Sequence, residues 1–168
     1  SARDAVALNP ALMKQDSAPL LAWHYTLGSH LLRILENGHI LPHDQPDTPA
    51  VECPLVWFSL NQRYEPSAAK RLQVNGVAQP PTLEVMRQLG NGVYRLGVPP
   101  RSLLTGETLR KHARISKDRW QTLAQQAQAC GAAISEWYGT IDPVPSSDCV
   151  IEVWQPDGSW ARVASPQR

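Results

Sequence analysis

The chain of 168 residues has only three cysteines, Cys53, Cys130 and Cys149, and no two of them are spaced as in zinc or redox motifs. An odd number of thiols without such spacing argues against structural zinc and against a disulfide framework, and it favours a reducing compartment. We interpret the three side chains as small buried apolar groups. Cys130 becomes a candidate nucleophile only if an activating histidine lies beside it.

Charged residues and long apolar runs are also scarce. Only 18% of the residues are charged, and the formal net charge is +1, which argues against a broad basic surface but allows nucleic acid as a local substrate. No apolar run approaches the roughly 20 residues needed to span a bilayer, and the first residues lack a secretory h-region. We predict a monomer without a membrane partner that is cytoplasmic, with a secreted effector as the alternative.

Sequence motifs for nucleotide phosphates and for metal ions are missing. Neither G-x-G-x-x-G nor G-x-x-x-x-G-K-[ST] occurs, so Rossmann and P-loop nucleotide binding have no support. Four histidines lie in expected helices or loops without ligand spacing, namely His30, His39, His43 and His112. The sequence therefore predicts no metal site.

The residues that are present fit one folded domain. A hydrophobic fraction of 42% in a chain of this length predicts a single core, which we assign to 20–168, after an N-terminal arm at 1–19. The 15 prolines and 10 glycines predict many short connections. Six tryptophans accompany one phenylalanine, and since each indole N–H needs a partner, several of them are expected at strand edges or in a cleft.

The hydrophobic pattern predicts more strands than helices, without strict alternation between the two. Strands are expected at 20–27, 55–60, 93–98, 133–139, 149–155 and 159–163. Helices are expected from the Ser29 N-cap to Asn37-Gly38, at 67–73, at 82–89, and at 117–130 after the Ser116 N-cap. The segment 99–115 is expected to be a loop that contains about one helical turn. This order argues against a doubly wound parallel sheet and predicts an α+β fold.

Three short segments combine residue types that suit sugar chemistry. The first is His24-Tyr25-Thr26 on the first expected strand, the second is Trp57-Phe58-Ser59, and the third is Ser135-Glu136-Trp137, followed by Pro143-Val144-Pro145 and another strand. Alternation along a strand places His24 and Thr26 on one face. Such a pair suits a face that contacts a ligand.

The order and spacing of these segments resemble the ADP-ribosyltransferase superfamily, especially its His/Tyr/Glu branch. That branch includes poly-ADP-ribose polymerases, DNA-modifying toxins and RNA 2′-phosphotransferases. The resemblance extends over 20–163. It implies split antiparallel β-sheets with flanking helices, NAD as the cofactor and substrate, and transfer of ADP-ribose to a protein or nucleic-acid acceptor, as in a toxin or effector. Trp57 replaces the usual tyrosine, and Ile134 stands where arginine-modifying members carry a second Glu or Gln.

The resemblance implies catalytic roles for two residues. Cleavage of the nicotinamide–ribose bond builds positive charge on the sugar, as in glycoside hydrolysis, and a carboxylate beneath the ring stabilises that charge. Glu136 is the candidate carboxylate, although Glu152 competes with it. His24 would donate to or accept from a ribose hydroxyl.

Further residues are implied in binding NAD. Thr26 would position the ribose or the adenosine, and the backbone of Tyr25 would pair with the nicotinamide amide. Trp57 or Tyr64 would stack on the nicotinamide ring. Arg95, or alternatively Arg33, would contact the pyrophosphate.

Other interpretations remain open at this stage. His24, Trp57 and Glu136 could each have an ordinary structural role, and the fold could serve as a non-enzymatic NAD- or partner-binding module. An RNA 2′-phosphotransferase would need a basic phosphate pocket, for which a cluster is available at Arg101, Arg110, Lys111, Arg114, Lys117 and Arg119. Acceptor specificity is expected in the loops at 43–54, 61–80 and 99–115.

Overall fold

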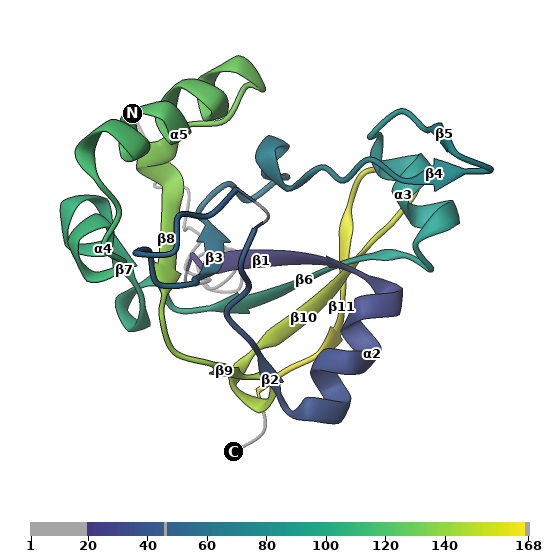
Figure 1. The fold of residues 1–168 in the computed structure, drawn as a ribbon. Coiled ribbons are helices and arrows are strands. Elements are labelled where there is room, and N and C mark those ends of the chain that lie inside the picture. Colours follow the sequence, from purple (N-terminus) through teal and green to yellow (C-terminus); the bar gives the residue numbers. More distant parts are fainter. Residues whose placement is uncertain (1–19, 46, 167–168) are drawn as a thin grey trace, which may run out of the picture.

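A seven-stranded antiparallel sheet forms the centre of the protein in the computed structural model, which describes residues 20–45 and 47–166 (Figure 1). In spatial order its strands are β11 (Trp160–Ala164), β10 (Val150–Trp154), β6 (Val93–Val98), β1 (Ala22–Leu27), β3 (Val56–Ser59), β8 (Trp137–Thr140) and β7 (Leu104–Thr105). The expected arm at 1–19 lies outside the described residues.

Two small sheets and four α-helices accompany the large sheet in the described part of the chain. The small sheets pair β2 (His39–Ile40) with β9 (Val144–Pro145), and β4 (Gln73–Val74) with β5 (Val77–Ala78). The helices are α2 (Gly28–Asn37), α3 (Leu83–Leu89), α4 (Gly106–His112) and α5 (Lys117–Ala129). Single 3₁₀ turns are η1 (Pro66–Ala68), η2 (Pro100–Ser102), η3 (Ile134–Glu136) and η4 (Ser146–Asp148).

The two faces of the large sheet are covered by different elements (Figure 1). One face packs against α2 and the β2–β9 pair, through a cluster that includes Ala22, Leu31, Ile40, Phe58 and Leu96. We call it the α2 face. The opposite face carries α4 and α5 over β3, β8 and β7, and α3 over the end formed by β1 and β6. We call it the tryptophan face because Trp23, Trp57 and Trp137 point to it, as the register pairs show.

The join between β1 and β3 is the weakest part of the sheet. β1 pairs with β6 over its whole length, from Ala22↔Val98 to Leu27↔Val93, whereas its register with β3 has the single pair Trp23↔Ser59. Beyond that pair the two strands no longer form a ladder. The sheet therefore consists of two nearly separate parts, β11-β10-β6-β1 and β3-β8-β7.

Several predicted helix ends are confirmed. Gly38 ends α2 in the left-handed conformation at φ 76°, and Ser116 caps α5 through the Arg119 N–H. Thr82, expected as the first residue of its helix, instead caps α3 through the Val85 N–H. The predicted Ser29 N-cap is wrong, since α2 already begins at Gly28 and has no side-chain cap. Gly28 N–H instead donates to the Gly92 carbonyl, so a neighbouring loop replaces the capping side chain.

Three predicted elements differ from the structure. The expected helix at 67–73 is only the turn η1, because the chain then turns at Asn75-Gly76 to form the β4–β5 hairpin. The expected loop at 99–115 contains α4, whose single buried apolar side chain, Leu109, gives little periodicity. The strand expected from residue 133 begins at Trp137, and η3 precedes it.

The prediction of a mixed α+β fold with antiparallel pairing is confirmed. The described helices are all too short, or too polar, to cross a bilayer.

Candidate functional site

His24 lies at the opening between β1 and β3. Its Nδ1 is 2.8 Å from the carbonyl oxygen of Trp57, and its ring lies 5.7 Å from the ring of Phe58. The residue is half-buried. This side chain therefore bridges β1 and β3 at the point where their backbone ladder stops.

The surroundings keep His24 uncharged. Burial lowers its pKa from 6.5 to about 4; the hydrogen bond to Trp57 opposes this effect, and the nearby ammonium of Lys70 adds to it. In a neutral imidazole the nitrogen that faces a carbonyl carries the proton, so Nδ1–H donates to Trp57. Nε2 is then an acceptor, suited to a hydroxyl donor such as a ribose 2′-OH.

Glu136 is the last residue of η3 and directly precedes β8. Its carbonyl oxygen accepts a hydrogen bond of 2.9 Å from the Leu60 N–H, which extends the β3–β8 pairing by one residue. The residue is half-buried, and among the described residues its carboxylate takes part in none of the four salt bridges. The backbone of Glu136 is thus fixed while its carboxylate stays uncommitted.

The strand register relates these two residues. The pairs Trp23↔Ser59 and Ser59↔Trp137 form one row across β1, β3 and β8, on the tryptophan face. His24 lies one residue after this row in β1, so its side chain alternates to the α2 face, whereas Glu136 lies one residue before the row in the turn η3, where strand alternation does not apply. They lie two strands apart and are offset by two residues along the strand direction, which corresponds to a Cα separation of about 12 Å.

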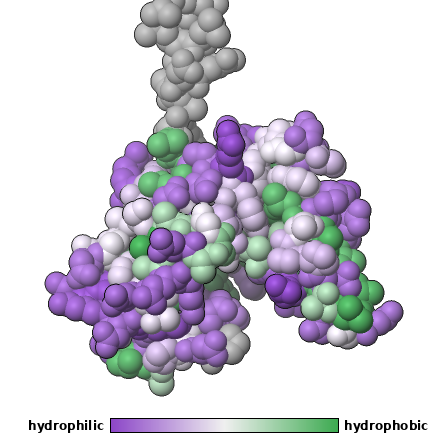
Figure 2. Space-filling model, turned by 90° about the horizontal axis from the view of Figure 1, so that it is seen from above, coloured by the Kyte–Doolittle hydropathy of each residue, from purple (hydrophilic) through white to green (hydrophobic). Residues whose placement is uncertain are grey.

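The surface on the tryptophan-face side of the sheet is indented. Figure 2 shows a notch between two lobes, which correspond to the α4–α5 side and to the side of α3 and the β4–β5 hairpin in Figure 1. β1 and β3 lie between those two lobes in Figure 1. Because both lobes cover the tryptophan face, the notch lies on the opposite side of the sheet from the His24 side chain.

The side chain of Trp57 points to the tryptophan face, away from the His24 ring that contacts its carbonyl oxygen. Its ring stacks against Trp120 of α5 at 6.4 Å and meets the edge of Trp137 at 5.6 Å. The expectation that it stacks on nicotinamide therefore has no support from this geometry, because helix α5 covers that face of its ring. The aromatic side chains on the α2 face include Phe58, which is buried, and Tyr94 and Tyr138, which are half-buried.

Tyr64, the alternative stacking residue, packs in a different place. Its ring meets Tyr25 edge to face at 5.2 Å, and burial raises its pKa. Together with Tyr25, Thr26 and Lys70 it lines a small hollow beside the end of β1. Tyr25 and Thr26 thus lie next to a space that Tyr64 partly closes, while Thr26 itself is buried.

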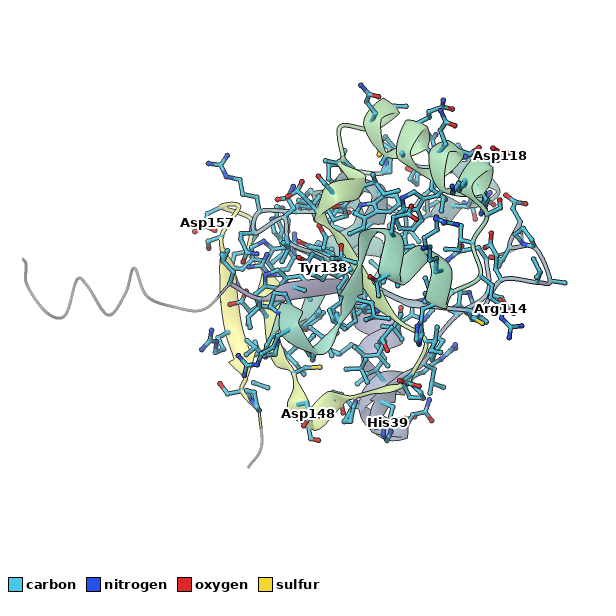
Figure 3. The ribbon with its side chains drawn as sticks, turned by 90° about the vertical axis from the view of Figure 1, so that its left-hand side faces the viewer. His39, Arg114, Asp118, Tyr138, Asp148 and Asp157 are labelled. Carbon is cyan, nitrogen blue, oxygen red and sulfur yellow. The ribbon has the colours of Figure 1, made fainter. Side chains whose placement is uncertain are left out.

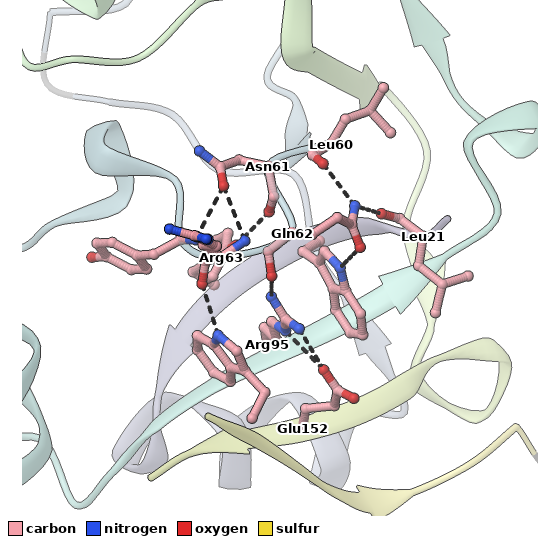
Figure 4. Close-up of polar contacts among 11 residues, drawn as sticks. Leu21, Leu60, Asn61, Gln62, Arg63, Arg95 and Glu152 are labelled. Carbon is pink, nitrogen blue, oxygen red and sulfur yellow. Dashed lines mark hydrogen bonds and ion pairs between the residues drawn. The ribbon is translucent and has the colours of Figure 1, made fainter. Parts of the chain in front are cut away.

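Arg95, expected at a pyrophosphate, is instead buried and bonds to Glu152 and Gln62 within the protein (Figure 4). Its Nη2 lies 2.7 Å from Glu152 Oε1, and its Nη1 donates to the Gln62 carbonyl at 2.6 Å. The guanidinium lies over Trp23 at 3.9 Å and over Trp160 at 4.3 Å. The guanidinium therefore makes three hydrogen bonds within the protein and is covered by indole rings, and Glu152, the competing carboxylate, is committed to this ion pair.

The other basic candidates lie on exposed elements. Arg33 is exposed on α2. In the expected phosphate cluster, Arg110 pairs with Glu107 at 2.9 Å and Arg119 approaches Glu52 at 3.5 Å, so two of its six cations are already matched. Figure 3 shows Arg114 and Asp118 at the outer edge of the molecule and Tyr138 near its middle. A basic cleft is therefore not apparent at this cluster.

A hollow of about 460 Å³ lies away from His24 and Glu136. It is lined by residues that follow β6 and β8, including Pro99, Leu103, Asp142 and Asp148. Neither candidate catalytic residue lines it. Of the three cysteines predicted to be buried, only Cys149 is; Cys53 is half-buried, and Cys130 is exposed at the end of α5.

The comparisons with known proteins identify no relative. No protein-family model matches the chain. No curated protein and no solved structure matches it significantly. The geometry of the site is therefore the basis for any functional proposal.

Two residues near the site were missed by sequence reasoning. Glu65 is buried and accepts hydrogen bonds from Ser59 and from the Trp137 indole. Tyr138 shares the face of His24, and its position in the strand that follows Glu136 was the available signal. Glu65 lies in an irregular loop, where no comparable sequence pattern exists. Among the described residues, no group of three or more His, Cys, Asp and Glu side chains is arranged to hold a metal ion.

Proposed function

We propose that this protein is an NAD-dependent ADP-ribosyltransferase with an ADP-ribosyltransferase-like fold, in which His24 binds the ribose of NAD and Glu136 stabilises the ribosyl cation. One observation carries the proposal. The three segments of the family resemblance are far apart in the sequence, yet they lie on the neighbouring strands β1 and β3 and at the start of β8, where the backbone of Glu136 bonds to Leu60.

The nearly divided sheet supports the same proposal. The resemblance implies split antiparallel sheets, and here a single register pair joins β1 to β3. The division leaves backbone groups of β1 after Trp23 outside the β3 ladder. Such groups are available to an amide-containing ligand such as nicotinamide.

The chemical roles follow from the state of each side chain. The neutral His24 presents Nε2 as an acceptor for a ribose hydroxyl, and an ionised Glu136 faces the developing positive charge at C1′. The C1′–N bond breaks and its electron pair leaves with nicotinamide. A nucleophile of the acceptor then bonds to C1′ and loses its proton. The carboxylate stabilises the charged sugar between these two events.

The direct test is incubation of the protein with NAD labelled separately in the nicotinamide and in the adenine. The proposal predicts release of free nicotinamide together with adenine label on a macromolecule from a lysate. Separate protein, DNA and RNA fractions identify the acceptor class. Absence of nicotinamide release in all fractions contradicts the proposal, and binding of NAD without release indicates a non-enzymatic module. Removal of an RNA 2′-phosphate indicates the phosphotransferase alternative.

A further inference from the structure

Glu65 is a buried carboxylate that the proposed mechanism leaves without a role. It lies in the loop between β3 and η1 and is 5% exposed. It takes part in none of the described salt bridges. A buried charge is costly unless hydrogen bonds compensate it. Its presence here is explained only by the groups that it binds.

The donors to Glu65 come from three separate elements. Oε2 accepts from the Ser59 hydroxyl, at the end of β3, at 2.6 Å. Oε1 accepts from the Ser67 hydroxyl of η1 at 2.6 Å and from the Trp137 indole N–H, at the start of β8, at 3.0 Å. One carboxylate therefore joins the loop after β3 to the first residue of β8.

That first residue of β8 directly follows Glu136. On the other side, η3 has no side-chain cap, and the backbone of Glu136 is tied to β3 through Leu60. The Trp137 side chain is thus the nearest anchored group along the chain from the proposed catalytic carboxylate. An anchored indole limits rotation of the backbone where η3 turns into β8.

We infer that Glu65 is a positioning residue for Glu136: its carboxylate holds the Trp137 indole, and through it the orientation in which Glu136 faces the bound ribose. The inference rests on the proposed function for its catalytic meaning. Its structural part, the dependence of Glu136 order on Glu65, can be measured without substrate.

Three variants separate positioning from charge. Glu65→Gln keeps an oxygen for Trp137 and Ser67, and the Ser59 hydroxyl can accept from the new amide, so the anchor survives without the charge. Glu65→Ala removes the anchor. Trp137→Phe removes only the indole N–H, which keeps a fold-preserving test available if Glu65→Ala does not fold. Glu152→Gln, which breaks the ion pair with Arg95 on the tryptophan face, is the control for general destabilisation.

The measurements are kcat and KM for nicotinamide release, the melting temperature, and the backbone ¹⁵N order parameter of Glu136. We expect kcat to fall about tenfold in Glu65→Ala and about threefold in Trp137→Phe, with KM unchanged, and to stay within about twofold in Glu65→Gln and Glu152→Gln. The order parameter of Glu136 should fall in Glu65→Ala and Trp137→Phe alone.

The outcomes distinguish the two claims. A Glu136 order parameter that is the same in Trp137→Phe, or in a folded Glu65→Ala, as in the wild type overturns the positioning inference, whether or not the protein is active. Loss of activity in Glu65→Gln equal to that in Glu65→Ala also overturns it, because the charge itself would then be required. A wild-type protein that releases no nicotinamide contradicts the proposed function, while the order parameters still decide the positioning.

Discussion

The network around Arg95 on β6 and the opening around His24 on β1 lie on opposite faces of the sheet and differ in how completely their polar groups are bonded. On the tryptophan face, Arg95 is held by Glu152, by the Gln62 carbonyl and by two tryptophan rings. Gln62 also accepts from the Trp23 indole and donates to the carbonyls of Leu21 and Leu60 (Figure 4). These contacts fix the loop after β3 to the sheet.

Around the His24 opening, fewer polar partners are present. His24 uses one ring nitrogen for the Trp57 carbonyl, and Glu136 takes part in no described salt bridge. Polar groups whose bonds are complete hold a fold together, whereas those with spare bonding capacity are suited to a ligand. The comparison therefore assigns stability to the Arg95 network and chemistry to the His24 opening.

The largest effect on stability is expected at the Arg95 network. Glu152→Gln leaves the buried Arg95 guanidinium without its counter-ion, so the free energy of unfolding should fall by about 3–5 kcal/mol, measured by urea denaturation. The matched control is Glu84→Gln, which breaks the exposed pair with Arg87 and should cost less than about 1 kcal/mol. Equal effects of the two substitutions would show that the Arg95 network is not a structural centre.

The largest effect on activity is expected at Glu136. Glu136→Gln keeps the size of the side chain but removes its charge, so kcat for nicotinamide release should fall about 10²- to 10³-fold. The melting temperature should not change, because no described ion pair is lost. Glu36→Gln, an exposed carboxylate on α2, serves as the control. Full activity in Glu136→Gln would remove the proposed role of this residue.

The titration of His24 gives a smaller effect on stability. Its pKa is about 4 in the folded protein and 6.5 in the reference state, so the unfolded chain takes up the proton first as the pH falls. The stabilising contribution of neutral His24 is complete above pH 6.5 and is lost as the pH falls towards 4, with a size of about 3 kcal/mol. We expect the difference in unfolding free energy between wild type and His24→Asn to change by this amount over that range. An unfolding free-energy difference that stays constant over this pH range would show that the pKa of His24 is not lowered in the folded protein.

The smallest effect separates the two nitrogens of His24. Asparagine can still donate to the Trp57 carbonyl in place of Nδ1 but lacks an acceptor in place of Nε2. We expect kcat/KM for NAD to fall about tenfold in His24→Asn, the equivalent of one lost hydrogen bond. His24→Gln, which reaches further into the opening, should recover part of the loss. Equal activity of His24→Asn and wild type would contradict a bond from Nε2 to the ribose.

The sequence predicted the fold best where one local rule decides the structure. Gly38 and Ser116 end or begin helices because backbone conformation or a capping oxygen acts within a few residues. The prediction failed for α4, whose only large apolar anchor is Leu109 and whose helix is aided by the Glu107–Arg110 pair. Periodicity cannot detect a helix that buries so little of one face.

The candidate site was predictable only in part for a related reason. Alternation along one strand correctly placed His24 and Thr26 on the same face. The functions suggested for Trp57 and Arg95 depended on contacts between distant strands, and those contacts bring Trp57 to α5 and Arg95 to Glu152. Single-sequence reasoning has no access to such pairings, and it had none to Glu65, whose donors are spread over residues 59–137.

A crystal structure of the Glu136→Gln variant with NAD tests the central claim most directly, because this variant should bind the substrate without consuming it. The account predicts that the nicotinamide ribose lies at the opening between β1 and β3, with one hydroxyl within hydrogen-bond distance of His24 Nε2 and with residue 136 beside C1′. NAD bound in the hollow lined by Pro99, Leu103 and Asp148, or anywhere else away from His24, would contradict it.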